Sequence, residues 1–313
     1  MRAVLGIDTS CYTTSCAIAD EHARLLAAER MLLPVKAGTC GLRQSEAVFI
    51  HLKQLPQVMD QAMSRINADI AAVCVSAKPV DGDDSYMPVF QAGLSAAKSL
   101  AAAMRIPCYE TTHQRGHMEA AQIGGSQMKG DFMALHLSGG TTDLLMVSGD
   151  CLTLLSASQD LPAGQLIDRV GVRLGLPFPA GPSLEQLAVR GRSTGRYGVN
   201  LDESGLHISG AEAQAIRDIE QETLNPEDIA AEVFDFISRS VFRLLSREQE
   251  EKGIHSVLIF GGVASSALLR EMLLNRIEYK RSRLDIRFGA PEYSGDNAAG
   301  VAMIGARRHF IRL

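Results

Sequence analysis

No stretch of the sequence is apolar enough to cross a bilayer, because none approaches the roughly 20 consecutive residues that a spanning helix needs. The six cysteines form no Cys-x-x-Cys pair, and no signal-peptide pattern is present. We therefore expect no membrane association and a reducing compartment, the cytoplasm. The net charge of −5 at pH 7 gives no overall positive field that would attract nucleic acid. Contact with RNA would need a partner or a local basic patch, for which the candidates are Lys280, Arg281, Arg283, Arg287, Arg307, Arg308 and Arg312, unless these form an ordinary solvated face.

What the chain does contain is a regular alternation of strand-like and helix-like segments, with 46% hydrophobic and 21% charged residues, as in globular proteins. This alternation is typical of an α/β fold. The Gly-rich segment 190–206 is expected to be a surface loop. The predicted strands are 3–8, 15–19, 70–75, 132–138, 142–148 and 254–260, and the predicted helices are 46–66, 88–104, 163–174, 183–190, 226–250, 264–275 and 297–310.

One short pattern occurs twice. Residues 5–10 and the strand at 15–19 resemble residues 135–140 and the strand at 142–148, since both read as a strand, a turn of small polar residues and a second strand. A repeated hairpin suggests two related halves facing each other across a cleft. We therefore expect two lobes, one formed by residues 1–110 with 296–313 and the other by residues 111–295.

Three turns have the composition of phosphate-binding loops, in which main-chain N–H groups converge and no Cβ blocks their approach. The third turn also precedes a helix, whose N-terminus favours an anion. No Walker A loop and no Gly-x-Gly-x-x-Gly motif is present, which disfavours P-loop and Rossmann folds. The pattern resembles the actin, hexokinase and acetate-kinase superfamily. The residues of the turns are Asp8, Thr9 and Ser10, then Ser138, Gly139, Gly140, Thr141, Thr142 and Asp143, and finally Gly261, Gly262 and Val263.

His113 and His117 are four residues apart, a spacing that places two imidazoles on one face of a helix. Such a pair can share a divalent ion such as Zn or Fe, and Asp296 is the candidate oxygen ligand. The alternative is a pair of partly exposed histidines with no ligand. A zinc protease would need Glu directly after the first His as its base, but Gln114 stands there, so a metalloprotease is disfavoured.

The ordered set of these motifs resembles the threonylcarbamoyladenosine synthase family, which is also known as the O-sialoglycoprotein endopeptidase or glycoprotease family. The resemblance extends over nearly the whole chain. It rests on residues 5–11, the histidine pair, residues 137–140, 164–168, 174–176 and 179–182, the turn at 261–263, Leu269 with Arg270, and Asp296 with Asn297.

The resemblance implies a two-lobed actin-like fold that transfers a threonylcarbamoyl group from its adenylate to an adenosine beside the anticodon of tRNA. It implies that His113, His117 and Asp296 bind a divalent metal, and that ATP or an adenylate is the cofactor. Family members work with partner proteins, so we expect a homodimer or a heterodimer with a relative of the same fold. Asp168 would bind the ribose hydroxyls, and Ser266 stands where the family has an Asn facing the base. The other implied nucleotide or substrate residues are His136, Leu137, Ser138, Gly139, Gly140, Gly181, Gly261 and Gly262.

The chain departs from the family around the reacting centre. Tyr12 and Thr13 replace an acidic pair, Thr141 replaces a histidine, and Asp143 stands where an amide is usual. Glu212 stands where the family has a lysine. We therefore interpret the chain as a divergent paralogue and assign no catalytic residue, since no Ser-His-Asp or Cys-His arrangement is evident. The alternatives are transfer of another carbamoyl-like or phosphoryl group, and a nucleotide-binding regulatory or scaffold subunit.

Overall fold

The computed structural model describes the chain except for residues 11, 35–41, 83, 126, 296 and 312–313. The described residues divide into two compact units, of which unit 1 contains residues 1–123 and 295–313 and unit 2 contains residues 124–294. Each unit is built on one β-sheet. The predicted boundary put residues 111–123 in the second lobe, whereas their contacts place them in unit 1. That the two predicted lobes are separate domains stays a prediction. In the described part of the chain, no helix has the length and apolarity required to span a membrane.

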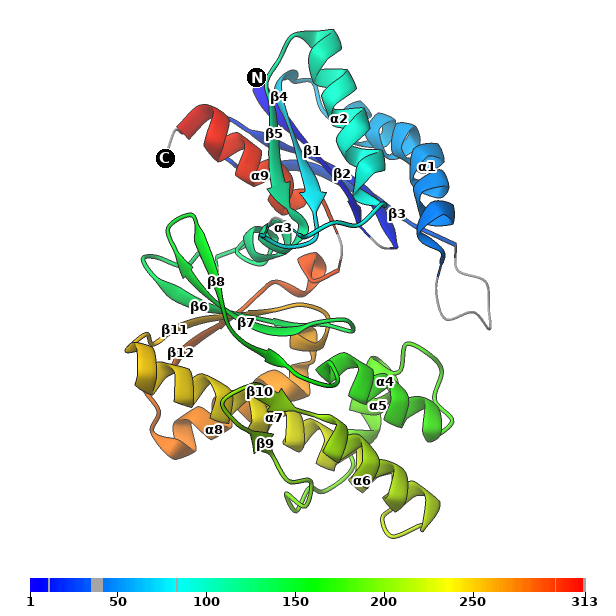
Figure 1. Ribbon diagram of the computed structural model, residues 1–313, viewed down its shortest axis with the longest axis vertical. Helices are drawn as coiled ribbons and strands as arrows, with labels where there is room; N and C mark the ends of the chain where they lie inside the picture. The colour runs from blue at the N-terminus through cyan, green and yellow to red at the C-terminus, as the bar shows by residue number, and fades with distance from the viewer. Residues whose placement is uncertain (11, 35–41, 83, 126, 296, 312–313) are drawn as a thin grey trace. The chain divides into compact units, whose positions relative to one another are not determined.

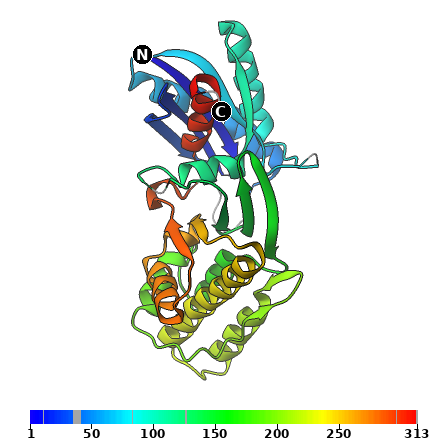
Figure 2. The same cartoon turned by 90° about the vertical axis from the view of Figure 1, so that its left-hand side faces the viewer.

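Unit 1 has a five-stranded sheet in the order β3-β2-β1-β4-β5. Helices α1 and α2 pack on one face through a core that includes Leu55, Val58 and Ala97, whereas α9 packs against β1 on the other face (Figures 1 and 2). Because both faces are covered, β2 is buried along its whole length. The elements are β1 (Arg2–Ser10), β2 (Thr13–Asp20), β3 (Leu25–Leu32), α1 (Gln44–Ser64), β4 (Asp69–Lys78), α2 (Phe90–Met104), β5 (Cys108–Thr112), α3 (His113–Ala120), α9 (Ala299–Ala306) and a π-helix (Arg307–Ile311).

Unit 2 has a seven-stranded sheet in the order β12-β11-β6-β7-β8-β10-β9. One hydrophobic core lies between this sheet and helices α4 to α8, and includes Leu135, Leu144 and Phe236. The elements are β6 (Phe132–Leu137), β7 (Thr142–Ser148), β8 (Cys151–Ser158), α4 (Ala163–Arg173), α5 (Gly181–Ala188), β9 (Asn200–Leu201), β10 (Gly205–His207), α6 (Ser209–Glu220), α7 (Pro226–Lys252), β11 (Ser256–Phe260), the 3₁₀ helix η1 (Val263–Ser265), α8 (Ala267–Lys280), β12 (Asp285–Phe288) and the 3₁₀ helix η2 (Pro291–Tyr293).

The two sheets share one topology. In unit 1, β1, β2 and β3 form an antiparallel meander, and β4 and β5 follow parallel to β1. In unit 2, β6, β7 and β8 form the same meander, and β11 and β12 follow parallel to β6. The order β3-β2-β1-β4-β5 thus recurs as β8-β7-β6-β11-β12. The predicted α/β fold with duplicated halves is confirmed, and the repeated hairpin seen in the sequence starts each half.

The segment 190–206 is more structured than its composition suggests. It contains β9 and the start of β10, and Tyr197 within it is buried. The buried carboxylate of Glu232 accepts hydrogen bonds from Thr194 N at 2.6 Å and Arg196 N at 3.0 Å, which ties the segment to α7. Most of the segment is exposed and irregular, as expected of a surface loop, and Glu232, 36 residues away along the chain from Arg196, anchors it.

Helices α3 and α9 of unit 1 cross at Gly116 and Gly300, and this close crossing leads to a stability prediction. A Cβ on Gly300 would lie 2.7 Å from Ala120 N, too close for any real side chain. We expect Gly300→Ala to lower the free energy of unfolding by about 1–3 kcal/mol in urea titrations. Gly210→Ala in α6 is the matched control, since its Cβ would meet no atom within 4 Å and its effect should stay within about 1 kcal/mol. Equal unfolding midpoints for the two variants would contradict the close crossing.

Candidate functional site

The first predicted phosphate turn, residues 8–10, is anchored through hydrogen bonds of the Thr9 side chain. Thr9 is buried, and its Oγ1 donates to Val89 O at 2.9 Å and accepts from Gly93 N at 3.1 Å. These bonds fix the end of β1 to the start of α2. Ser10 is also buried, and its Oγ has no hydrogen-bond partner among the residues that the structure describes. Because the Thr9 hydroxyl is already engaged, Thr9 would offer a ligand its main chain.

His51 in α1 supports the same turn, and the sequence analysis did not single it out. Its side chain is completely buried, and Nδ1 lies 2.8 Å from the hydroxyl of Thr14 on β2. Burial lowers the pKa of His51 to about 4, and the nearby charge of Asp8 opposes this shift. His51 is therefore neutral near pH 7. A lone histidine among the apolar positions of a predicted helix gave no signal of this role.

The two histidines of the predicted metal pair are brought together at the start of α3. Thr112 caps this helix by accepting a hydrogen bond from Arg115 N at 3.3 Å. The ring centroids of His113 and His117 are 4.3 Å apart, and His113 Nδ1 lies 3.0 Å from Asp8 Oδ1. Two imidazoles this close suit a divalent ion such as Zn or Fe.

The third predicted metal ligand, Asp296, lies outside the described residues. Within the ranges that the structure does describe, no three His, Cys, Asp or Glu side chains are grouped to hold a metal. The complete ligand set therefore stays a prediction, and the described part of it is the His113–His117 pair.

The second predicted phosphate turn connects β6 to β7 and contacts the start of α4. The Ser138 hydroxyl accepts hydrogen bonds from Gly140 N at 3.3 Å and Thr141 N at 3.1 Å. Thr142 Oγ1 accepts from Ala163 N at 2.9 Å, which caps α4. A Cβ on Gly164 would lie 2.6 Å from Gly139 Cα, so the helix approaches the turn closely. The turn is thus held in place before any ligand arrives.

Two further predicted binding residues precede this turn on β6. His136 stacks on Phe260 with ring centroids 4.8 Å apart, and the side chain of Leu137 is buried in the core. Leu137 could therefore meet a ligand only through its main chain.

The third predicted phosphate turn follows β11 and requires glycine at its first position. Gly261 has φ of +106°, and a Cβ there would lie 2.8 Å from the carbonyl carbon of Leu137. After η1, Ser266 caps α8 by accepting from Leu269 N at 3.1 Å. Arg270 then fixes η1 from the side, donating to Ala264 O and Gly289 O, both at 2.7 Å.

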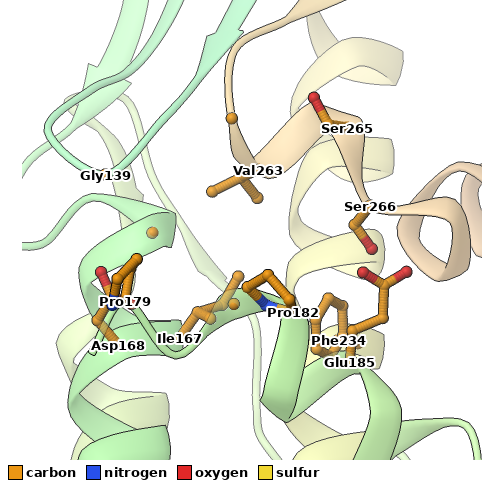
Figure 3. Close-up of a pocket in the computed structure, with 13 residues that line it drawn as sticks. Gly139, Ile167, Asp168, Pro179, Pro182, Glu185, Phe234, Val263, Ser265 and Ser266 are labelled. Atoms are coloured by element: carbon orange, nitrogen blue, oxygen red, sulfur yellow. The ribbon is translucent and has the colours of Figure 1, made fainter. Parts of the chain in front are cut away.

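A cavity of about 370 Å³ lies among these elements of unit 2, and we call it the unit 2 cavity. Figure 3 shows Val263, Ser265 and Ser266 on one side of it, across from Pro182 and Glu185. Of the residues predicted to bind nucleotide or substrate, it brings together Gly139, Asp168, Gly181, Gly262 and Ser266. Its other lining residues are Gly164, Ile167, Pro179, Pro182, Glu185, Phe234, Val263 and Ser265.

Two carboxylates of the cavity wall are fixed by main-chain N–H groups. Asp168 Oδ1 accepts from Ala180 N at 2.8 Å, and Glu185 Oε1 accepts from Leu268 N at 2.8 Å. Burial raises the pKa of Asp168, and the bond from Ala180 opposes this. Sequence reasoning missed Glu185, although it lies four residues after Gly181, one helical turn along the same face.

Three glycines of the cavity are not required by the fold itself. A Cβ added to Gly139 or Gly262 would meet no atom within 4 Å, and one added to Gly181 would only touch Ile167 Cγ2 at 3.9 Å. Gly140 is equally open, and none of these four has a positive φ. Neither packing nor backbone conformation therefore demands glycine at these positions.

The duplicated sheets and the turns that line the unit 2 cavity define the class, an α/β protein of the actin and hexokinase fold. Solved structures support this fold. Component A of (R)-2-hydroxyglutaryl-CoA dehydratase from Acidaminococcus fermentans has a TM-score of 0.59 at 15% identity, covering 98% of this chain and 99% of the other. A ROK family glucokinase from Streptomyces griseus in complex with glucose and AMPPNP has a TM-score of 0.56 at 14% identity, covering 96% and 98%.

The sequence comparisons identify the family. Residues 40–303 match the family model of tRNA N6-adenosine threonylcarbamoyltransferase, TsaD. A curated relative of that name from Aromatoleum aromaticum is 31% identical over 97% of this chain and 91% of its own length. The chain therefore belongs to the tRNA N6-adenosine threonylcarbamoyltransferase family, a family of acyl transferases, and the resemblance predicted from its motifs is confirmed.

The buried His51 generates a pH prediction. Its pKa is about 4 when folded and 6.5 in the unperturbed state, so the unfolded chain binds more protons between these values. The unfolding free energy should therefore fall as pH drops from 6.5 towards 4, with about 3 kcal/mol assigned to His51. His51→Gln should remove this part of the slope, as measured by urea titrations across that range. The exposed His22→Gln variant is the control, and identical slopes in both variants would contradict the assignment.

Proposed function

We propose that this chain transfers a threonylcarbamoyl group from threonylcarbamoyl adenylate to the exocyclic nitrogen of an adenosine near the anticodon of tRNA. The observation that carries the proposal is the unit 2 cavity in a chain of this family, because five predicted nucleotide residues from separate elements line it. The acceptor would reach the protein through a local basic patch or a partner, either a second copy or a relative of the same fold.

The adenylate, or ATP, is proposed to occupy the unit 2 cavity. The main-chain N–H groups of Gly139 and Gly262 are proposed to donate to phosphate oxygens, since a Cβ at either position would meet no atom within 4 Å, and the N-terminus of α8 adds a partial positive charge. Asp168 has one oxygen anchored to Ala180 N, which orients its carboxylate for ribose hydroxyls. Ser266 stands at the position proposed to face the base. The AMPPNP named with the S. griseus glucokinase supports a nucleotide of this type.

A divalent metal, Fe or Zn, is proposed to bind His113 and His117, with Asp296 as the oxygen ligand. The spacing on α3 and the 4.3 Å between ring centroids support the histidine pair. When bound, such an ion would supply a Lewis acid that can neutralise negative charge on a phosphate group. The donor set of imidazoles with one carboxylate fits either metal.

The chemistry proposed for this site depends on positioning. The adenine amine attacks the carbamoyl carbon, the bond from that carbon to the AMP oxygen breaks, and the amine loses one proton. AMP is a good leaving group once its charge is stabilised by N–H donors, so precise placement of the weakly nucleophilic amine is the main requirement. We assign no residue as the proton acceptor.

A second candidate function is transfer of a different carbamoyl-like or phosphoryl group by the same site. The observation that favours it is Asp143, a half-buried carboxylate on β7 that replaces the amide of the family. Burial raises the pKa of Asp143. The first turn meanwhile has Tyr12, which is exposed, and Thr13 in place of an acidic pair.

The open glycines generate a binding prediction. Gly139→Ala and Gly262→Ala should each weaken ATP or AMP binding about 10- to 100-fold, because a methyl group blocks contact with an N–H donor worth about 1–3 kcal/mol. Thermal stability should not change, since neither Cβ would meet a protein atom. Calorimetric titration measures the affinity. Gly198→Ala, equally open but outside the cavity, is the matched control. Wild-type affinity in both cavity variants would refute the phosphate role.

The transfer reaction itself is tested by mass spectrometry of unmodified tRNA. The tRNA is incubated with the protein, threonylcarbamoyl adenylate and partner proteins, and threonylcarbamoyladenosine is quantified. We expect product with the wild type and at least a 100-fold loss with His113→Ala, if the metal stabilises the leaving group by about 3 kcal/mol. His22→Ala should retain full activity. Tight nucleotide binding without any product would favour the second candidate function.

A further inference from the structure

A buried carboxylate lies directly behind the first histidine of the proposed metal pair. Asp8 is near the end of β1, and its side chain is completely buried. Its Oδ1 lies 3.0 Å from Nδ1 of His113, which is 105 residues away along the chain. The His113 side chain is itself only 19% exposed. This contact joins the sheet of unit 1 to the first residue of α3.

The chemistry of the two groups sets the direction of this hydrogen bond. When the Asp8 carboxylate is the acceptor, the hydrogen of this bond belongs to the imidazole, and His113 carries it on Nδ1. In the neutral ring the other nitrogen, Nε2, is then unprotonated, which is the form that binds metals. Asp8 thus selects one of the two neutral tautomers of His113.

The position of Asp8 suits a hydrogen-bond partner of His113 and not a metal ligand. It contacts the Nδ1 side of the ring, opposite to Nε2, and it is not grouped with His113 and His117 as a three-residue metal site in the part of the chain that the structure describes. Metal-binding histidines commonly donate their second N–H to a carboxylate, which fixes the ring and raises its basicity.

We infer that Asp8 is a positioning residue that holds His113 with Nδ1 protonated and so presents Nε2 to the metal. This inference rests on the proposed function, because it assumes that the histidine pair binds a divalent ion. It adds a residue outside the predicted ligand set. Asp8 belongs to the first predicted phosphate turn, so its hydrogen bond to His113 also links that turn to the metal pair.

The test measures metal affinity and histidine tautomer in the apo protein, with no tRNA present. Zn²⁺ and Co²⁺ affinities are measured by chelator competition for the wild type, Asp8→Ala and Asp8→Asn. Asp8→Ala should bind both ions about 10- to 100-fold more weakly. Asp8→Asn keeps an oxygen that can accept from Nδ1, so its loss should be smaller.

The matched control is Asp20→Asn. Asp20 is an equally buried carboxylate in the same sheet, but it accepts from Arg24 N at 2.8 Å and His22 N at 2.9 Å and touches neither metal histidine. This variant should lose stability while keeping wild-type metal affinity. It separates a general loss of packing from a specific effect on His113.

Nitrogen-15 NMR of the apo protein reads the tautomer directly. We expect His113 to be protonated at Nδ1 in the wild type and in Asp20→Asn, and to shift towards Nε2 protonation in Asp8→Ala. Unchanged metal affinity in Asp8→Ala, or a wild-type His113 protonated at Nε2, would overturn the inference while leaving the proposed function standing. A wild type that binds neither ion would instead overturn the metal role in the proposed function, and the inference with it.

Discussion

The close approach of two main-chain segments at the ends of β6 and β11 is the constraint on which the unit 2 cavity depends. These parallel strands end side by side, and Gly261 turns the chain against the carbonyl group of Leu137. A side chain at Gly261 would push the two turns apart. Gly164 makes the equivalent approach from α4 to Gly139. Glycine at these two positions lets three elements meet, whereas the open glycines leave the space that results accessible.

Hydrogen bonds at the N-termini of α4, α5 and α8 then hold this arrangement. Thr142 caps α4, Asp168 binds the chain just before α5, and Glu185 binds the first turn of α8. Each bond links the start of a helix to a neighbouring element, so the N-terminal ends gather around one cavity. Helix N-termini attract anions, and a site that is ordered before binding avoids much of the entropy cost of ordering it later.

The two halves share a topology but have different tasks. In unit 2 the turn after the first strand lines a cavity, whereas the corresponding turn in unit 1 is tied to α1 and α2 through Thr9, Thr14 and His51. Unit 1 contributes the histidine pair instead. The chain keeps the residues at its predicted phosphate and metal positions, while Tyr12 and Asp143 stand where the resemblance leads us to expect other groups.

The sequence by itself determined the α/β class, the duplicated hairpin and the histidine spacing on α3. These features depend on periodicity and on residues a few positions apart, so they can be read locally. Only the tertiary structure decided that edge strands such as β3 and β12 pair at all, since half-exposed strands have a weak apolar pattern. It also decided that Glu185 lines the cavity, that Glu232 anchors residues 194–196, and that Asp8 contacts His113. Such contacts join residues that are far apart along the chain, and they exist only because packing brings their elements together.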